Sequence, residues 1–591
     1  MTFSQKNCTT RLIFKGLQEK LSEKICKTLL QDGNLVPIQI IEYDCTQNRG
    51  NKKNSTEQLT EHQRQSAKAA PKYFDQTSLF KEAEKRNTNF VSVIGEAGIG
   101  KTVLAKDLAK NYAAQTPSTA DGPYVFYIPL KGVNFQKRVN VLQFLITPLL
   151  SDWESNEERD RRLTRLLNES SNVYIFIDGL DEIDGKLLKN CPKDINLYDS
   201  CCPAVIMQSL LSEKILPKAK KLVTSRPAAF LHLHHECIPK FNLRILGLSQ
   251  EAQKKLCLKI CKNDEKECNR VLEALDSNLD FTAISYVPFS FEMIVRYLRK
   301  QPTSTLSQTT TLTDLFTETF ARYVRSPHLR SETNSLKKLI ELAMEGMKED
   351  KFTFHFDEIP RNTESTKDFL QAEAHADINH PDEEILEGDK IFSFTHMLWQ
   401  EYFAAIQLMF FADAKTILSF EELEEDERWV KVLRFAFGFQ KVSAKRNIER
   451  YFHPPKLDLF SQNTKYLKEL VLLTVQKGFI VESCAYAFEA HNQSLAETIC
   501  QHFPDTLKFS EIYDPSEFMA ISFVLRCKKL TPRQIYMWDF FNSFVFRGRS
   551  LQTLLDAVND NGHKVRKKQS FGNPDLLRWS ESNEIFVWSL H

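Results

Sequence analysis

Residues 91–112, VSVIGEAGIGKTVLAKDLAKNY, constrain the fold of this chain more than any other segment. Gly95, Gly100, Lys101 and Thr102 fit the pattern G-x-x-x-x-G-K-[ST], with an apolar strand-like run before it and an amphipathic helical run after it. Glycine is needed where the backbone turns tightly, because the N–H groups of such a loop must converge on an anion. The segment predicts a strand, a phosphate-binding loop and a helix. The competing interpretation is a glycine turn before a core helix.

The loop residues are the expected ligands of a nucleotide. We expect the ammonium group of Lys101 to neutralise the β- and γ-phosphates and the hydroxyl of Thr102 to bind Mg²⁺. The helix that begins near Lys101 also points the positive end of its dipole at the phosphates. The predicted nucleotide-binding residues of the loop are Gly95, Glu96, Ala97, Gly98, Ile99, Gly100, Lys101, Thr102 and Val103.

Acidic residues follow a second apolar strand in SNVYIFIDGLDEID, residues 171–184. Asp178 stands at the carboxyl end of that strand, where ligands bind in parallel sheets. Since Mg²⁺ takes one or two carboxylates and keeps its waters, we expect Asp178 to act beside Thr102 in metal binding. Asp181 and Glu182 follow within one turn and are expected to orient an attacking water. A solvated acidic turn is the alternative.

A third strand, in KLVTSRPAAF (221–230), carries Arg226 to the same edge of the sheet. Its guanidinium group is suited to reading a γ-phosphate, but an arginine after a strand is equally often a surface charge. The predicted catalytic residues are thus Asp181, Glu182 and Arg226, and the predicted metal-binding residues are Thr102 and Asp178.

Strands and helical segments alternate between residues 73 and 248, and mainly helical segments follow. This alternation predicts a parallel sheet with helices on both faces, in a chain too long for a single core. The predicted strands are 90–94, 125–130, 173–177 and 221–224, with helical segments at 142–150 and 161–167 between them. The later helices are predicted at 249–262, 266–275, 289–300, 311–325, 335–349, 397–411, 463–478 and 482–502, with a hairpin and loop at 351–388.

Charge and composition exclude several classes of protein. With 78 Lys and Arg against 77 Asp and Glu the net charge is +1, so nothing in the overall charge attracts nucleic acid. No apolar run reaches the roughly 20 residues of a membrane span, and the first residues contain no secretory signal core. We therefore expect a cytoplasmic protein whose 13 cysteines are reduced thiols. Zinc held by Cys257 and Cys261 together with His232, His234, His235 and Cys237 is the less favoured alternative.

Taken in order, GEAGIGKT, FIDGLDEID and VTSRP resemble the NACHT branch of the signal-transducing STAND ATPases. The small Gly179 directly after Asp178 is typical of that branch. YVPFSFEMIVRYL (286–298) resembles the family segment whose proline touches the adenine, here Pro288. FSFTHMLWQEYFAA (392–405) resembles the winged-helix segment whose histidine meets the β-phosphate of ADP, here His396.

The residues around His396 leave two interpretations open. Thr395 can cap a helix that begins with His396, which would place the imidazole beside free N–H groups in the first helical turn, a setting suited to an anion. The apolar neighbours instead favour a buried core histidine. The resemblance favours the phosphate contact.

The resemblance covers residues 73–500 and implies a multidomain α/β P-loop NTPase like the central region of animal NOD-like receptors. The implied units are an N-terminal helical segment and linker (1–72), the NACHT domain (73–248), a helical domain (249–305), a winged-helix domain (306–412), a second helical domain (413–505) and a weakly patterned C-terminal region (506–591). This last region resembles the approach to a leucine-rich-repeat sensor, although no L-x-x-L-x-L repeat follows.

The function implied by the resemblance is an ATP/ADP-dependent signalling switch in innate immunity or cell death. Exchange of ADP for ATP would release a closed state for homo-oligomerisation and for binding of unidentified signalling proteins. An ATP-turnover enzyme of the remodelling type is the alternative and should carry an arginine finger. An adaptor that binds no nucleotide is disfavoured by the intact Lys101, Thr102 and Asp178.

Overall fold

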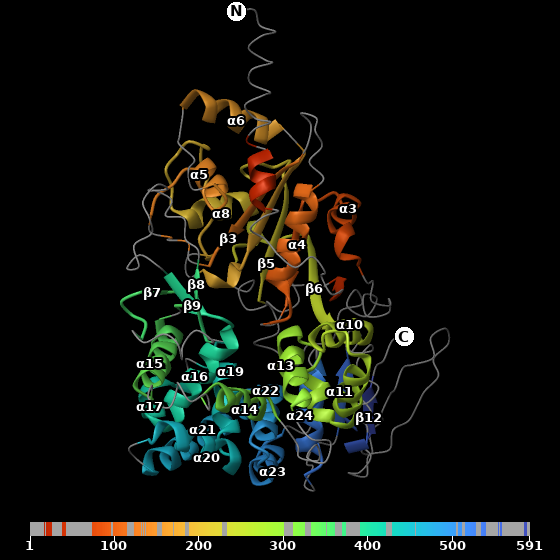
Figure 1. Ribbon diagram of the computed structural model, residues 1–591, viewed down its shortest axis with the longest axis vertical. Coiled ribbons are helices and arrows are strands. Elements are labelled where there is room, and N and C mark those ends of the chain that lie inside the picture. Colours follow the sequence, from red (N-terminus) through yellow and green to blue (C-terminus); the bar gives the residue numbers. More distant parts are fainter. Residues whose placement is uncertain are drawn as a thin grey trace, which may run out of the picture.

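In a computed structural model, the chain forms a sheet-containing part and a mainly helical part. The sheet-containing part lies above the helical part in Figure 1. It describes residues 17, 19–25, 38–42, 74–95, 98–114, 123–131, 133, 135, 137–150, 157–169, 171–183, 188–226, 233–300, 311–324, 333–349, 351–360, 369–373, 391–420, 423, 428–454, 457–503, 506–510, 515–527, 534–538, 553–554, 556–557 and 584–587.

The first part is built on a six-stranded sheet with the strand order β1-β6-β2-β5-β4-β3. Five strands are parallel, and only the edge strand β1 is antiparallel, to β6. Near-continuous apolar runs suit strands that are covered on both faces, and every residue of β2, β4 and β6 is buried. The strands are β1 (Ile38–Glu42), β2 (Phe90–Ile94), β3 (Tyr124–Pro129), β4 (Val173–Asp178), β5 (Lys220–Ser225) and β6 (Phe241–Leu248).

Helices cover both faces of this sheet. The chain crosses from β2 to β3 in one direction and returns through β4 to β5 in the other, so right-handed crossovers place the later helices opposite α4. α3 lies on the α4 face, where the rings of Phe80 and Tyr112 meet at 5.5 Å. The helices are α3 (Leu79–Glu84) and α4 (Lys101–Ala114) on one face, and α5 (Val141–Ile146), α6 (Glu157–Glu169) and α8 (Pro203–Leu211) on the other.

The α/β class, the multidomain organisation and the four predicted strands are confirmed, with two differences. The sheet is mixed rather than wholly parallel, and it contains two strands that the sequence analysis did not predict, β1 and β6. β1 comes from within residues 1–72, which we had placed in a separate segment. Its apolar run closes the open edge of β6 and therefore belongs to the same core.

The second part is mainly helical, as predicted. In Figure 1 the group from α14 to α21 lies to the left, and α10 to α13 lie to the right beside α24. The first helices are α10 (Gln250–Ile260), α11 (Glu265–Ser277), α12 (Leu279–Ile284), α13 (Pro288–Arg299), α14 (Leu312–Val324), α15 (Thr333–Glu349) and α16 (Met397–Phe410). The later helices are α17 (Ala414–Ile417), α19 (Arg428–Gly438), α20 (Val442–Phe452), α21 (Leu457–Gln476), α22 (Ile480–Glu489), α23 (Gln493–Gln501) and α24 (Pro515–Leu525).

Two small sheets accompany these helices. Strands β7 (Phe354–His355), β9 (Ile391–Phe394) and β8 (Leu370–Glu373) form an antiparallel sheet in that order beside α16. Strands β10 (Thr506–Ser510), β11 (Gln534–Trp538) and β12 (Glu584–Val587) form a parallel sheet within the region that we had found weakly patterned.

One predicted helix is two helices. The segment 482–502 was predicted as a single helix, but α22 ends at Glu489 and α23 begins at Gln493. His491 between them has a left-handed backbone with φ of 46°, and the side chain of Asn492 caps α23 by accepting from the N–H of Leu495. A left-handed residue cannot continue a helix, so the chain turns there.

The two parts have separate hydrophobic cores that touch at the end of β6. Ile245 packs in the sheet core, whereas Leu248 packs in the helical core. Gly247 has φ of 100°, and a Cβ atom there would lie 2.2 Å from the carbonyl oxygen of Tyr286. Tyr286 itself packs into the sheet core and accepts from the N–H of Leu248 at 2.8 Å. This close approach fixes the start of α13 against the sheet.

A buried ion pair holds the helical part together. Arg434 on α19 lies 2.9 Å from Glu489 on α22, and the same carboxylate accepts from the N–H of Thr313 on α14 at 2.6 Å. Burial alone would raise the pKa of Glu489, but Arg434 and the Thr313 N–H outweigh it and lower the pKa.

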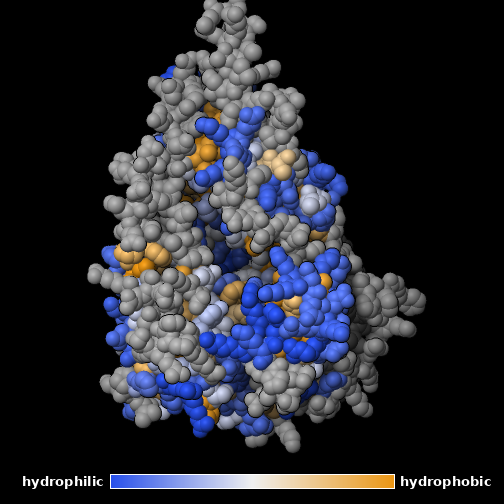
Figure 2. Space-filling view, in the orientation of Figure 1, coloured by the Kyte–Doolittle hydropathy of each residue, from blue (hydrophilic) through white to orange (hydrophobic). Residues whose placement is uncertain are grey.

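The exposed faces of α10, α11 and α13 are largely hydrophilic (Figure 2). Among the helices that the structure describes, none has the length and apolar character needed to cross a membrane.

Candidate nucleotide-binding site

The predicted phosphate-binding loop joins β2 to α4 at the carboxyl edge of the sheet. Gly98 and Gly100 have positive φ values of 77° and 106°, the conformation for which glycine was expected. The N–H of Gly95 donates to the carbonyl oxygen of Ser225 at 3.1 Å, which ties the loop to the end of β5. Glu96 and Ala97 lie outside the described residues.

The other loop residues differ in exposure. Ile99 is buried in the sheet core, so its side chain anchors the loop, whereas Val103 on the first turn of α4 is 45% exposed. The Nζ atom of Lys101 donates to the carbonyl oxygen of Gly95 at 2.8 Å, so the ammonium group lies over the loop that it was predicted to serve. The structure therefore brings Lys101, the loop and the N-terminus of α4 together.

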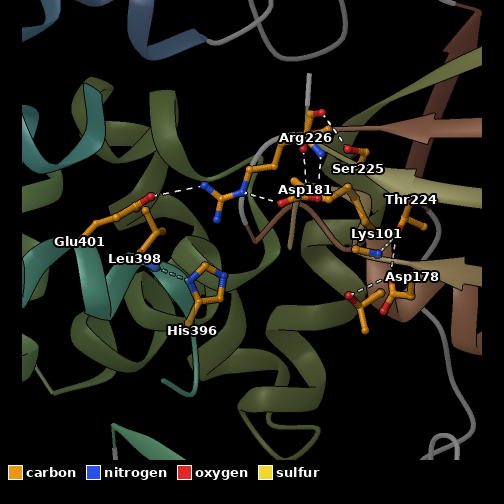
Figure 3. A network of polar contacts seen from close by, with 12 residues as sticks. Lys101, Asp178, Asp181, Thr224, Ser225, Arg226, His396, Leu398 and Glu401 are labelled. Carbon is orange, nitrogen blue, oxygen red and sulfur yellow. Dashed lines mark hydrogen bonds and ion pairs between the residues drawn. The ribbon is translucent and has the colours of Figure 1, made fainter. Parts of the chain in front are cut away.

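Asp178 at the end of β4 accepts hydrogen bonds from three hydroxyl groups. Oδ1 accepts from Thr224 at 2.5 Å and from Thr102 at 3.3 Å, and Oδ2 accepts from Tyr127 at 2.8 Å. The pairing of Asp178 with Thr102 is the arrangement predicted from sequence, and Figure 3 shows Asp178 and Thr224 beside Lys101. Hydrogen bonds to both oxygens fix the orientation of the carboxylate.

Arg226 follows β5 and lies between two carboxylates. Its Nε lies 3.1 Å from Asp181 Oδ2, and its backbone N–H donates to Asp181 Oδ1 at 3.0 Å. Its Nη1 reaches Glu401 on α16 at 3.4 Å, so this arginine joins the sheet domain to the helical part (Figure 3). Of the predicted catalytic residues, Asp181 and Arg226 are thus brought together. The side chain of Glu182, in the short 3-10 turn η3 (Leu180–Glu182), lies outside what the structure describes.

His396 enters the site from the helical part. A Cβ atom on Gly98 would lie 2.7 Å from Nε2 of His396, and the imidazole stacks on the ring of Phe289 at 3.9 Å. We had expected Thr395 to cap the helix and His396 to lie in its first turn. Instead α16 begins at Met397, and Nδ1 of His396 is the cap, accepting from the N–H of Leu398 at 3.1 Å.

The cap fixes the tautomer of His396, and its surroundings fix the protonation state. Because Nδ1 accepts a hydrogen bond, the neutral ring carries its proton on Nε2, the nitrogen that faces the loop. Burial, with the positive charges of Arg226, Lys101 and Lys131, lowers the pKa of His396 to about 3. The ring is therefore a neutral donor aimed at the loop.

Pro288 is the first residue of α13 and carries no N–H, which suits that position. The next residue, Phe289, reaches the loop, since its Cβ would lie 3.2 Å from a Cβ on Gly98. The described contacts thus bring Phe289 to the loop, one residue from the predicted Pro288.

Four residues of this arrangement were missed. Tyr127 and Thr224 lie on β3 and β5, which flank β4 on its two sides. Their contact with Asp178 can be predicted only when the strand order is known. Phe289 reaches the loop because Tyr286 fixes the start of α13 against the sheet, and this packing cannot be recognised in the sequence. Glu401 left a signal in the sequence, a single acid within the apolar run of α16, where it is 1% exposed.

The NACHT domain model matches residues 89–264. This chain contains a NACHT domain. The match covers the strands β2 to β6, the loop, Asp178 and Arg226, and it also includes α10.

The relatives of this chain are named for the same domain. Human NACHT, LRR and PYD domains-containing protein 3 is 25% identical over 321 residues, which are 53% of this chain and 30% of that protein. Human NACHT, LRR and PYD domains-containing protein 12 is 24% identical over 488 residues, which are 78% of this chain and 44% of that protein. The chain thus spans less than half the length of these relatives.

Among solved structures, a STAND protein with a tetratricopeptide repeat sensor from Pyrococcus horikoshii is similar with a TM-score of 0.26 and 13% identity, over 84% of this chain and 66% of that one.

Proposed function

We propose that this chain is a nucleotide-dependent switch in which bound ADP holds the NACHT domain closed against the helical part. One observation carries the proposal: His396, the cap of a helix in the helical part, lies against Gly98 of the phosphate-binding loop. A donor on Nε2 at that place would meet a phosphate bound by the loop only while the two parts are closed.

The residues present fit a nucleoside diphosphate or triphosphate with Mg²⁺. The glycines with positive φ, Lys101 and the N-terminus of α4 suit phosphate oxygens. Asp178 and Thr102 would hold Mg²⁺, which supplies charge neutralisation at the phosphates. Because both oxygens of Asp178 already accept hydrogen bonds from hydroxyl groups, we propose that Asp178 binds the ion through water.

The contact of His396 with a bound phosphate would give ADP and ATP different preferences for the closed state. A ligand shifts an equilibrium between closed and open states only by its difference in affinity for them. His396 and Glu401 contact the sheet domain from the helical part, so their contacts are lost on opening. We propose that exchange of ADP for ATP removes this preference and releases the open form for homo-oligomerisation.

The ATP-turnover enzyme remains the second candidate, and the state of Arg226 argues against it. A catalytic arginine must be directed at the γ-phosphate. Here the guanidinium group is engaged by Asp181 and Glu401, so it serves the closed arrangement of the two parts.

We also propose the domain division 73–248, 249–305, 306–412 and 413–505, with the third unit a winged helix. The antiparallel sheet β7-β9-β8 beside α15 and α16 supports that unit. The relatives are named for LRR and PYD domains as well as NACHT, which supports a role as the switch of a receptor-like signalling protein. We place it in the cytoplasm, in innate immune or cell-death signalling with protein partners.

The nucleotide that co-purifies with the full chain tests the proposal. The protein is denatured, the released nucleotide is identified by chromatography, and ATP turnover is measured separately. We expect close to one equivalent of ADP and turnover well below about 1 per second, the lower end of ordinary enzymes. The Lys101→Ala variant is the control and should carry none. Turnover of many per second would instead support the enzyme, and nucleotide retained by Lys101→Ala would refute the loop assignment.

A further inference from the structure

A second group of metal-ligating side chains lies away from the phosphate-binding loop. The ligand atoms of Cys191, His234 and Glu236 all lie within 4.8 Å of one another. They come from two connections of the NACHT domain, the one before α8 and the one between β5 and β6. We propose that these three residues bind a zinc ion, with water as the fourth ligand.

The chemistry of the three donors selects the metal. Thiolate, imidazole and carboxylate are the groups that bind Zn²⁺, and sites with three protein ligands keep a fourth position for water. Ligand atoms around tetrahedral zinc lie about 3.5 Å apart, so the three side chains need to close by about 1 Å. Cys191 and Glu236 are exposed and can make that rotation without disturbing the core.

The backbone already holds the two connections together. The N–H of His234 donates to the carbonyl oxygen of Leu188 at 3.1 Å. Lys214 donates to the carbonyl oxygen of Pro192 at 2.8 Å and lies 3.6 Å from Glu236. The turns that carry Cys191 and His234 are therefore adjacent before any metal binds, which reduces the entropy that binding must overcome.

Each donor gives up little to bind. Cys191 makes a long contact of 3.8 Å to the carbonyl oxygen of Pro192. Nδ1 of His234 accepts a weak hydrogen bond from the N–H of Glu236 at 3.4 Å. This bond is lost whichever ring nitrogen binds the metal, because Nδ1 then holds either the metal or the proton. Glu236 faces Lys214 with Oε2, and its second oxygen can turn to the metal.

The local charge also suits a divalent cation. Lys214 lies 3.6 Å from both Asp194 and Glu236. With a thiolate on Cys191, three negative charges face the one positive charge of Lys214, which leaves two to be neutralised by Zn²⁺.

This site differs from the alternative weighed in the sequence analysis. Cys257 and Cys261 lie in the core of the helical part, whereas Cys237 lies in the sheet core. The partner of His234 is Cys191, which is 43 positions earlier in the chain, so the group could not be recognised from spacing. Zinc here would join the connection that follows Arg226 to the one before α8.

The test uses the full chain, freed of metal by a chelator and without nucleotide. Zn²⁺ is titrated and the retained zinc measured by mass spectrometry, and Co²⁺ serves as the spectroscopic probe. We expect one equivalent of zinc and a sulfur-to-cobalt charge-transfer band. Cys191→Ser and His234→Asn should each weaken binding by at least about 100-fold, and Cys191→Ser should remove the band. Cys201→Ser, ten positions later in the chain, and the exposed His355→Asn in the helical part should change neither. Retention of the equivalent and the band in Cys191→Ser, or no zinc in the unaltered chain, would overturn the proposal.

A second measurement needs no variant. Iodoacetamide labelling of Cys191 in the unaltered chain, followed by peptide mapping, should slow at least about tenfold when one equivalent of Zn²⁺ is added, because the thiolate is then coordinated. An unchanged labelling rate at Cys191 would also overturn the proposal.

Discussion

Nε2 of His396 faces Gly98 so closely that a single added methyl group on the glycine would lie 2.7 Å from it. The pair joins the start of a helix in the helical part to the phosphate-binding loop of the NACHT domain. Arg226 and Glu401 join the same two parts a short distance away. These two cross-contacts define the closed arrangement on which the following predictions rest.

Replacement of Asp178 by Asn should separate metal binding from nucleotide binding. The amide keeps an acceptor oxygen but loses the charge that would attract Mg²⁺, so affinity for ATP with Mg²⁺ should fall by about tenfold or more. Affinity for ADP in EDTA should change much less. Isothermal titration with and without Mg²⁺ measures both.

Tyr127→Phe is the matched control, because it removes one hydrogen bond to Asp178 and leaves the charge. It should cost about 0.5–1.5 kcal/mol of stability and leave the effect of Mg²⁺ intact. Equal losses with and without Mg²⁺ in Asp178→Asn would show that Asp178 has no role toward the metal.

Glu401→Gln should favour the open form by weakening the contact with Arg226. Glu401 is 1% exposed and its Oε1 lies 3.4 Å from the guanidinium group, so a charge-assisted contact worth about 1.5–3 kcal/mol is reduced to a neutral one. We expect ADP to dissociate at least several-fold faster. The comparison is Arg296→Gln, which breaks an exposed pair with Glu292 in α13 and should have no effect. Identical dissociation rates in the two variants would show that Glu401 does not stabilise the closed form.

Acid should open the nucleotide-free protein. Burial, with Arg226, Lys101 and Lys131, lowers the pKa of His396 to about 3, whereas an exposed imidazole has a pKa of about 6.5. The open form therefore binds a proton that the closed form excludes, so the closed form loses stability as the pH falls from about 6.5 toward 3. Each unit in that window should shift the ratio about tenfold toward the open form.

Sedimentation velocity at pH 7.5 and 5.5 measures this shift in the nucleotide-free chain, with His396→Leu as the comparison. The unaltered chain should become more extended at pH 5.5, and the variant should show a weaker dependence. A bound ADP phosphate beside the ring would favour the protonated form and reduce the effect. A pH response that is the same in His396→Leu would assign it to other groups.

The site was predictable where its residues are close in sequence. The loop, its strand and helix, and Asp178 at a strand end are local patterns, and the structure brings them together as expected. The cap at His396 was misplaced by one residue, because an imidazole nitrogen can accept the bond that we assigned to Thr395. The role of Glu401 could not be predicted from its position in α16, because its partner Arg226 lies 175 positions away in the chain.

The missed strand β6 shows a limit of reading polarity from sequence. Its buried Asn242 interrupts the apolar pattern of FNLRILGL, yet it is satisfied across the sheet, where it accepts from the hydroxyl of Ser92 at 2.6 Å. A polar residue that is paired on a neighbouring strand costs little, and a single strand does not reveal its partner. β1 was missed because its pairing with β6 crosses some 200 residues of chain.

The rate of ADP release from the His396→Leu variant tests the central claim most directly. Leu keeps most of the apolar volume, so packing should cost within roughly 1–2 kcal/mol, while a hydrogen bond to phosphate worth about 1.5–3 kcal/mol is lost. His396→Asn separates the two roles of the ring, since Asn restores the cap to Leu398 but is too short to reach the loop. Stopped-flow release of a fluorescent ADP should be about 10- to 100-fold faster in both variants, with ATP binding retained. Release at the rate of the unaltered chain, with only a lower melting temperature that Asn restores, would show that His396 is a structural cap and would contradict the switch.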